Sequence, residues 1–254
     1  MFNKRIIGRL DIKSNFLIKG IRMEGWKKIG DPVEYAKNYY KSGIDELILL
    51  DVVASLYNRN NLTGIISEIA SEVFIPITAG GGIRSVSDAE ILLKAGADKV
   101  TLNTAAIKNP EIIKSISCAF GSQATVVAIE CKKDSSSQNW EPLTDNGRNN
   151  TNLNAISWAM KAEEMGAGEI LLTSIDQDGT KLGCDIDLFK EISSKVNIPV
   201  IGSGGVGTLS DVENILKSKC VDAIAIASAL HFNNLSLKSI RKVFNKLGYE
   251  TRGQ

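Results

Sequence analysis

The sequence contains only one histidine, His231, and four scattered cysteines, Cys118, Cys131, Cys184 and Cys220, with no Cys-x-x-Cys pair among them. One histidine and isolated cysteines do not form a metal-binding cluster, and a histidine-dependent nucleophile would have only this candidate. We therefore expect no metal and no cofactor. We expect the cysteines to be small core residues of a protein that acts in the reducing cytosol.

Long apolar runs are also missing, because no stretch approaches the 18 or so residues that cross a bilayer. The charged residues Lys4 and Arg5 come too early for a signal peptide, so we expect neither a membrane span nor a secretory leader. Charge of one sign is absent too, since 30 basic and 29 acidic residues leave a net charge of +1. We expect no nucleic-acid or membrane partner, and any anionic ligand must be held by a local site.

Short apolar runs alternate with helical patterns along all 254 residues. The predicted strands are 5–11, 46–52, 75–80, 97–103, 124–130, 169–176, 198–203 and 222–227. They are continuously apolar, which is typical of parallel strands covered by helices, and segments such as 31–43, 85–96 and 153–166 have helical spacing and end at glycine. Eight strand–helix units without a linker predict an α/β fold, a (β/α)8 TIM barrel in a single domain over residues 1–254.

An internal repeat supports the barrel. Segment 43–51 resembles 166–176, segment 78–85 resembles 201–208, and segment 97–105 resembles 221–229, at an offset of about 123 residues. We interpret the chain as two similar half-barrels, about 1–122 and 123–254. Because half a barrel cannot close its own sheet, we expect one domain with doubled features at its strand ends.

Two glycine turns are doubled in this way, at 79–83 after the third strand and at 202–207 after the seventh. Glycine lets the backbone approach a ligand, and its N–H groups can bind phosphate oxygens. One such turn could be only a tight connection. Two turns related by the repeat, each facing a segment with small and hydroxyl residues (103–105 and 227–229), predict a ligand with a phosphate at each end.

Two carboxylates end strands that lie on opposite sides of the predicted barrel, Asp11 on the first strand and Glu130 on the fifth. Each could act as a general acid or base, with Lys13 or Lys132 available to tune its pKa. The alternative is that each acid forms only a local ion pair. Three further aspartates crowd the same rim: Asp51, Asp176 and Asp178.

Charged residues also begin several strands at the opposite end, the barrel floor. They are Arg5, Glu46, Lys99 and Glu169. The floor of such a barrel normally serves stability, so one interpretation is a salt-bridged plug. The other is a polar entrance to the barrel interior, and the pattern alone leaves both open.

Two connections on the active-site side are long. Residues 13–30 form a basic connection with glycines at Gly20 and Gly25, which indicates a hinged lid carrying Lys19 over an anionic ligand, or else a merely decorative loop. Residues 132–152 are polar and of low complexity at their start, which indicates a partly mobile loop.

Eight segments resemble the cyclase subunit of imidazole glycerol phosphate synthase, and together they extend over nearly the whole chain: KRIIGRLDIK, IKG, GDPVEYAKNYYKSGIDELILLDVVAS, TAGGGIRS, GADKVTLNTAAIKNP, FGSQATVVAIECK, GAGEILLTSIDQDGTKLGCD and GSGG. The resemblance implies a glutaminase partner docked on the barrel floor, whose ammonia travels through the barrel. At the other end, ammonia would react with a bisphosphorylated ribulosyl formimino carboxamide ribotide. The products would be imidazole glycerol phosphate and an aminoimidazole ribotide.

The resemblance also implies residue roles. It makes Asp11 one catalytic acid–base residue and places Glu130 where the second, an aspartate, stands in the family. It implies an ammonia gate of Arg5, Glu46, Lys99 and Glu169, and a mobile-loop residue, Lys19. It implies one phosphate site at Gly82, Asn103 and Thr104, and a second at Asp178, Gly179, Gly205 and Ser228.

Three departures from the family pattern stand out: Arg9 replaces a usual cysteine, Ser14-Asn15 replaces an Asp-Gly pair, and Glu130 replaces aspartate. Glutamate moves its carboxylate by about 1 Å, which can cost on the order of 10²-fold in a tuned acid–base site. The segments RLDIK, RMEGWKK, DVVASLYNRNNL, IECK and TDNGR look more like a paralogous branch found with surface-polysaccharide genes. That branch is associated with the use of ammonia to form an acetamidino group on a sugar.

We therefore expect an ammonia-using subunit with a glutaminase partner, and we favour the sugar-amidating branch, whose substrate would be a sugar nucleotide, over the bisphosphorylated ribotide of the histidine pathway. A two-phosphate sugar isomerase is less favoured, because it needs no charged entrance at the floor. A non-catalytic conduit that activates the glutaminase is a further alternative.

Overall fold

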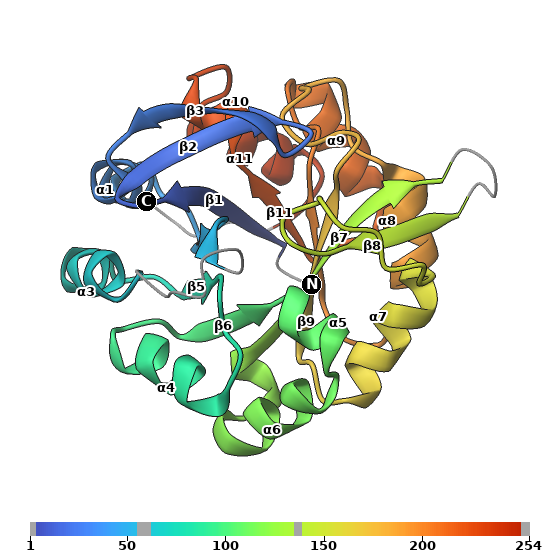
Figure 1. Ribbon diagram of the computed structural model, residues 1–254. Coiled ribbons are helices and arrows are strands. Elements are labelled where there is room, and N and C mark those ends of the chain that lie inside the picture. Colours follow the sequence, from blue (N-terminus) through green and yellow to red (C-terminus); the bar gives the residue numbers. More distant parts are fainter. Residues whose placement is uncertain (1–3, 55–61, 135–138, 250–254) are drawn as a thin grey trace.

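The computed structural model describes residues 4–54, 62–134 and 139–249, and its central feature is a closed barrel of parallel strands (Figure 1). In barrel order the strands are β1 (Arg5–Lys13), β4 (Glu46–Asp51), β5 (Ile77–Gly80), β6 (Lys99–Leu102), β7 (Thr125–Lys133), β9 (Glu169–Ser174), β10 (Val200–Ser203) and β11 (Ala223–Ile226). Parallel pairing of β11 with β1, from Arg5 opposite Ala223 to Gly8 opposite Ile226, closes the ring. The predicted (β/α)8 barrel is confirmed.

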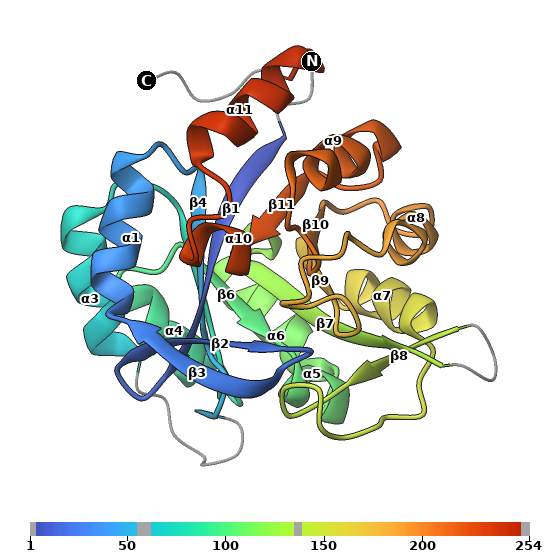
Figure 2. The same ribbon diagram turned by 90° about the horizontal axis from the view of Figure 1, so that it is seen from above.

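Helices cover the outside of the ring (Figure 2). They are α1 (Pro32–Lys41), α3 (Thr63–Glu72), α4 (Val86–Lys94), α6 (Glu111–Phe120), α7 (Ala155–Glu164), α8 (Ile186–Ser193), α9 (Leu209–Ser218) and α11 (Leu237–Lys246), with the short helices α5 (Thr104–Lys108), α10 (Ser228–His231) and η1 (Ser122–Ala124). Local sequence sets their starts. The Asp31 side chain accepts a hydrogen bond from Val33 N ahead of Pro32, and Thr208 and Asp211 form a capping box for α9.

The strands separate two apolar layers. One layer lies between strands and helices and includes Leu10, Leu47 and Phe189. The other fills the barrel interior, where Ile7, Val126 and other inward side chains pack together. Because side chains alternate along a strand, a continuously apolar strand such as β4 supplies both layers, which explains the absence of polar alternation in the sequence.

The half-barrel repeat is visible in the strand positions. β4 begins at Glu46 and β9 at Glu169, and β5 begins at Ile77 and β10 at Val200, so both pairs keep the offset of about 123 residues seen in the sequence. None of the helices in the described ranges is both long and apolar enough to cross a membrane.

The connection 13–30, predicted to be a hinged lid or a decorative loop, contains regular structure. β1 runs past the barrel rim and turns at Ser14, and the chain returns as β2 (Phe16–Ile21) and β3 (Glu24–Gly30), an antiparallel hairpin over the barrel mouth. Gly20 is a point of close approach: a Cβ there would lie 2.0 Å from the Glu24 carbonyl oxygen. In β2 the four central residues 17–20 are all buried and only the end residues Phe16 and Ile21 are exposed, so the strand is covered on both faces.

The connection 132–152 also contains regular structure. β8 (Trp140–Leu143) pairs antiparallel with the end of β7, with Glu130 opposite Leu143 and Lys133 opposite Trp140. A turn follows, held by the bridge between Thr144 and Asn149. The low-complexity start that we expected to be mobile falls at 135–138, outside the described residues. Hairpin β2–β3 and β8 lie at one end of the barrel, and α11 and the start of β1 lie at the other (Figure 2).

Candidate active site

The two predicted acids face the barrel mouth from opposite sides. Asp11 is on β1 and Glu130 on β7, and three strands separate β1 from β7 in either direction around the ring. Both side chains are buried, Asp11 completely and Glu130 with 7% of its surface exposed. The lysines that we expected to tune them do not do so, because Lys13 and Lys132 are exposed to solvent. The cations that pair with Asp11 are instead Arg9 and Lys19.

Asp11 forms two ion pairs. Its Oδ1 accepts a hydrogen bond from Arg9 Nε at 2.8 Å, and its Oδ2 accepts one from Lys19 Nζ at 3.1 Å. Burial opposes ionisation of Asp11, but the charges and hydrogen bonds of Arg9 and Lys19 outweigh it and hold the pKa of this carboxyl well below its usual range. Asp11 is therefore a stable anion.

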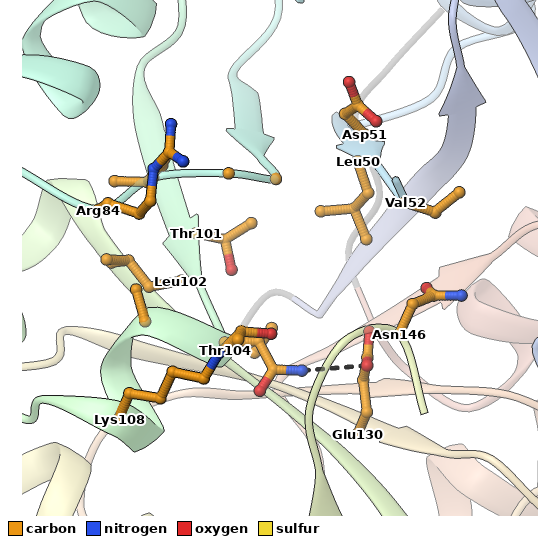
Figure 3. Close-up of a pocket in the computed structure, with 16 residues that line it drawn as sticks. Leu50, Asp51, Val52, Arg84, Thr101, Leu102, Thr104, Lys108, Glu130 and Asn146 are labelled. Atoms are coloured by element: carbon orange, nitrogen blue, oxygen red, sulfur yellow. Dashed lines mark hydrogen bonds between the residues drawn. The ribbon is translucent and has the colours of Figure 1, made fainter. Parts of the chain in front are cut away.

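Glu130 has a different environment. Its Oε2 accepts a hydrogen bond from Asn103 Nδ2 at 3.0 Å (Figure 3), and within the described ranges no lysine or arginine forms an ion pair with it. Burial raises the pKa of Glu130 to about 7. The Arg9 charge and the Asn103 hydrogen bond lower it, whereas Asp11 and Asp178 raise it further. Glu130 can therefore exchange a proton near neutral pH.

Lys19 connects the hairpin to the mouth. Its Nζ donates to Asp178 Oδ1 and Oδ2 at 2.9 and 2.8 Å as well as to Asp11, and it is only 3% exposed. Burial alone would lower the pKa of Lys19, but the charges of Asp178 and Asp11 raise it overall. The ammonium group is thus held between two carboxylates below the hairpin.

A cavity of about 160 Å³ opens beside Glu130, several times the roughly 30 Å³ of one water molecule (Figure 3). Its lining includes three predicted phosphate-site residues: Gly82, Asn103 and Thr104. It also includes two cations that sequence reasoning missed, Arg84 and Lys108, which stand across the cavity from Glu130. The sequence signal was their position: Arg84 comes just after the glycine turn 79–83, and Lys108 comes shortly after segment 103–105.

A second, smaller cavity of about 20 Å³ lies at the repeat-related position, with room for about one water molecule. It contains all four residues predicted for the second phosphate site: Asp178, Gly179, Gly205 and Ser228. Gly205 has a φ of +98° and a Cβ there would lie 1.9 Å from the Gly183 carbonyl oxygen, so the tight turn itself requires glycine. Within the lining of this cavity no lysine or arginine is present.

The four floor charges form a closed ring of alternating sign. Arg5 contacts Glu46 at 3.0 Å and Glu169 at 2.5 Å. Lys99 contacts the same two carboxylates at 3.2 and 2.9 Å. The structure therefore has the salt-bridged plug, and each acid is shared between two cations. Whether the ring also opens as an entrance is a separate question.

The remaining rim aspartates have structural contacts. Asp51 Oδ1 accepts a hydrogen bond from Val53 N at 3.0 Å, and Asp176 Oδ2 accepts one from Lys133 N at 2.8 Å. Asp51 also lines the larger cavity. Both carboxylates thus hold backbone N–H groups at the rim, which indicates a structural role for these contacts.

Arg9 is the mouth residue whose importance the sequence did not reveal. It lies on β1 between Ile7 and Asp11, both inward-facing, and only 1% of its surface is exposed. Its Nη1 donates to Thr173 Oγ1 at 2.9 Å and to Ser203 Oγ at 3.3 Å, on β9 and β10. The signals in the sequence were its replacement of the family's usual cysteine and its place at an inward strand position.

These features define a (β/α)8 barrel of two similar halves, with buried acids at its mouth and a charged ring at its floor. The family of histidine biosynthesis proteins matches residues 5–236. The chain is 57% identical over 211 residues to the imidazole glycerol phosphate synthase subunit HisF of Legionella pneumophila, covering 83% of this chain and 99% of the relative. It is 44% identical over 252 residues to the subunits HisF of Clostridium botulinum and Dehalococcoides mccartyi, covering 99% of this chain. The chain belongs to this family.

Proposed function

We propose that the protein is the cyclase-type subunit of a glutamine amidotransferase-coupled synthase. It receives ammonia from a glutaminase docked on the barrel floor and uses it at the mouth. The observation that carries this proposal is the charged ring of Arg5, Glu46, Lys99 and Glu169, which closes the end of the barrel opposite the buried acids. Membership in the HisF family supports the same function.

The floor ring is suited to a gate. Its ion pairs are partly exposed on the side of the cations, with 24% of the Arg5 side chain and 18% of the Lys99 side chain accessible, so a docked partner can reach them. Since each glutamate is held by two cations, one cation can move while the other still neutralises the acid. Above the ring, the interior is apolar, which suits passage of uncharged ammonia.

At the mouth, we assign Asp11 and Glu130 as the catalytic pair. We assign Gly82, Asn103 and Thr104, with Arg84 and Lys108, to one phosphate group of the substrate. We assign the other phosphate group to the repeat-related residues Asp178, Gly179, Gly205 and Ser228. Lys19 lies beside them, because its Nζ donates a hydrogen bond to Asp178. Because the smaller cavity holds only about one water molecule, its loops must shift when a phosphate binds.

Within this function we favour the branch that amidates a sugar for surface polysaccharide over histidine biosynthesis. Two features of the mouth favour it: the longer acid Glu130 and the fully buried Arg9 beside Asp11. All four cysteines are free thiols, which fits action in the cytosol. The histidine-pathway reaction is the alternative, and in both cases ammonia adds to a carbonyl carbon.

The discriminating experiment supplies the purified protein with ammonium chloride and the ribulosyl formimino carboxamide ribotide, and follows loss of the ribotide. We expect little turnover by the natural protein and a gain with Glu130→Asp, which restores the shorter acid. Fast turnover by the natural protein would instead assign it to the histidine pathway. Glu90→Asp, on an exposed helix face, is the matched control and should leave the rate of ribotide loss unchanged.

An isomerase and a non-catalytic conduit are disfavoured by different features. An isomerase has no use for a floor ring, and a conduit has no use for a buried acid whose pKa lies near neutrality. Turnover of an aldose-type phosphate without any ammonia would support the isomerase instead.

A further inference from the structure

Arg9 crosses part of the barrel interior. It starts on β1, and its guanidinium group reaches the hydroxyl groups of Thr173 on β9 and Ser203 on β10. The same group donates through Nε to Asp11. Arg9 thus ties Asp11 to the far wall of the C-terminal half-barrel. Its Nη2 is buried and has no hydrogen-bond partner among the residues that the structure describes.

This arrangement makes Asp11 a poor proton carrier. Protonation of Asp11 would weaken its contacts with both Arg9 and Lys19, and would leave two buried cations with less compensating charge. The groups facing Asp11 are Arg9 on the same strand, Lys19 on β2, Glu130 across the mouth on β7, and the buried His231 on α10, whose own pKa is lowered to about 4 by burial. His231 is therefore neutral and adds no charge near neutral pH.

Glu130 is placed to exchange protons. The cavity beside it is lined by Thr101 on β6 and Ala128 on β7, whereas the partners of Arg9 lie on β9 and β10. Thr101 Oγ1 is buried and has no hydrogen-bond partner within the described ranges. Glu130 thus borders this cavity, whereas Asp11 is not among the residues that line it. The groups facing Glu130 are Arg9 and Asp11 on β1, Asp178 after β9 and Asn103 after β6, with Arg84 and Lys108 across the cavity.

We propose that Arg9 is a positioning residue that holds Asp11 as a fixed carboxylate anion and leaves proton transfer at the mouth to Glu130. This division of roles rests on the proposed function in one respect, namely that the reaction is addition of ammonia. The geometry of Arg9, Asp11 and Glu130 that carries it belongs to the free protein.

The proton balance is simple. The lone pair of ammonia forms the new nitrogen–carbon bond with a carbonyl carbon of the substrate, and the carbonyl π electrons move to the oxygen. The Glu130 carboxylate takes one proton from the nitrogen and returns it to that oxygen, so the residue ends in its starting state. Asp11 remains an anion throughout and stabilises the positive charge that develops on nitrogen.

The test is a carboxyl titration of the free protein by 13C NMR with side-chain-labelled aspartate and glutamate. Glu130→Gln and Asp11→Asn assign the two resonances. We expect the Glu130 resonance to titrate with a midpoint near 7 and the Asp11 resonance to stay constant from pH 5 to 9. Titration of Asp11 within this range, or a Glu130 that stays ionised throughout, would overturn the proposal.

Arg9→Met keeps most of the side-chain length but removes the charge. Because the Arg9 charge lowers the pKa of Glu130, the Glu130 midpoint should move upward in Arg9→Met and stay nearly unchanged in Arg9→Lys. Arg148→Met, at an exposed arginine, is the matched control and should leave the midpoint unchanged. An unchanged midpoint in Arg9→Met would show that Arg9 only fills space. If Arg9→Met does not fold, the carboxyl titrations of Arg9→Lys and of the natural protein still test the proposal.

Kinetics at a fixed concentration of free ammonia separate this proposal from the proposed function. Arg9→Met should lower kcat by about 10- to 100-fold with little change in KM, and it should shift the pH profile in the same direction as the NMR midpoint. Absence of turnover of both the ribotide and sugar nucleotides by every form would contradict the proposed function while leaving the titration result intact. Turnover with an unshifted profile would overturn only the role of Arg9.

Discussion

Lys19 Nζ lies 2.9 and 2.8 Å from the two carboxylate oxygens of Asp178, and this contact joins the β2–β3 hairpin to the loop after β9. The two residues are 159 positions apart in the chain. The same ammonium group also contacts Asp11, so the hairpin, strand β1 and the second cavity share one buried cation. The hairpin therefore contributes a buried charge to the candidate site.

Replacing Lys19 should destabilise the protein strongly. Lys19→Met leaves Asp178 and part of Asp11 buried without a cation, and breaking a buried ion pair in this way costs about 3–5 kcal/mol. Urea unfolding at neutral pH measures the change. Lys13→Met, at an exposed lysine on the neighbouring strand, should change the free energy of unfolding by less than about 0.5 kcal/mol. Equal effects of the two variants would contradict the role of the buried cation.

Lys99 tests the floor ring. In Lys99→Ala, Arg5 is the one remaining cation of the ring for the two carboxylates of Glu46 and Glu169, and the gap should let ammonia escape between the two subunits. We expect glutamine-dependent activity to fall about tenfold or more, which corresponds to about 1.4 kcal/mol, with ammonium-dependent activity unchanged. Lys94→Ala, at an exposed helix position, should affect neither activity. A similar loss of both activities in Lys99→Ala would refute the gate.

Glu130 should make the protein less stable as the pH rises. Burial raises its pKa from 4.5 to about 7, so between these values the folded state binds more protons than the unfolded state, and stability falls as the pH increases. The penalty is complete above about pH 7 and amounts to roughly 3 kcal/mol.

Glu130→Gln removes this penalty. Urea unfolding at pH 5 and pH 8 should show that the variant gains stability relative to the natural protein mainly at the higher pH. Glu90→Gln, on the exposed face of α4, should differ from the natural protein by the same amount at both pH values. A Glu130→Gln difference that does not change with pH would be the contrary result.

His231 should have the opposite effect. Its pKa is lowered by burial from 6.5 to about 4, so the unfolded state binds more protons in this window and stability is lost as the pH falls from 6.5 towards 4. Its ring stacks on Tyr39, whose hydroxyl lies 2.6 Å from His231 Nδ1.

His231→Phe keeps a ring but cannot be protonated, so it should flatten the acid branch of stability against pH, by roughly 3 kcal/mol over the full window. Tyr39→Phe is the matched control, because it removes the hydrogen bond and retains the titrating imidazole. It should lower stability by about 1 kcal/mol and preserve the acid dependence. Thermal unfolding between pH 4 and 7 measures both variants, and an acid branch that survives in His231→Phe would show that another group causes it.

Much of the architecture could be predicted from the sequence. The apolar strands, the helix caps and the repeat are local patterns, and in a parallel barrel all strand ends meet at one rim. Knowing that Asp11 and Glu130 end strands was therefore enough to place both at the mouth, and knowing that Glu46 and Glu169 begin strands was enough to place both at the floor. The hairpin β2–β3 was missed because its glycines and lysines resemble those of a loop.

The charge pairing at the mouth required the tertiary structure. Arg9 contacts Thr173 and Ser203, which are 164 and 194 positions away, and sequence spacing carries no information about such contacts. The nearby Lys13 and Lys132 looked like the tuning cations, but they point to solvent, where their charges are screened. The sequence determined which acids reach the mouth. Burial and the ion pairs with Arg9 and Lys19 decided that Asp11 stays charged while Glu130 titrates near neutrality, because both effects depend on which groups the closed barrel brings together away from water.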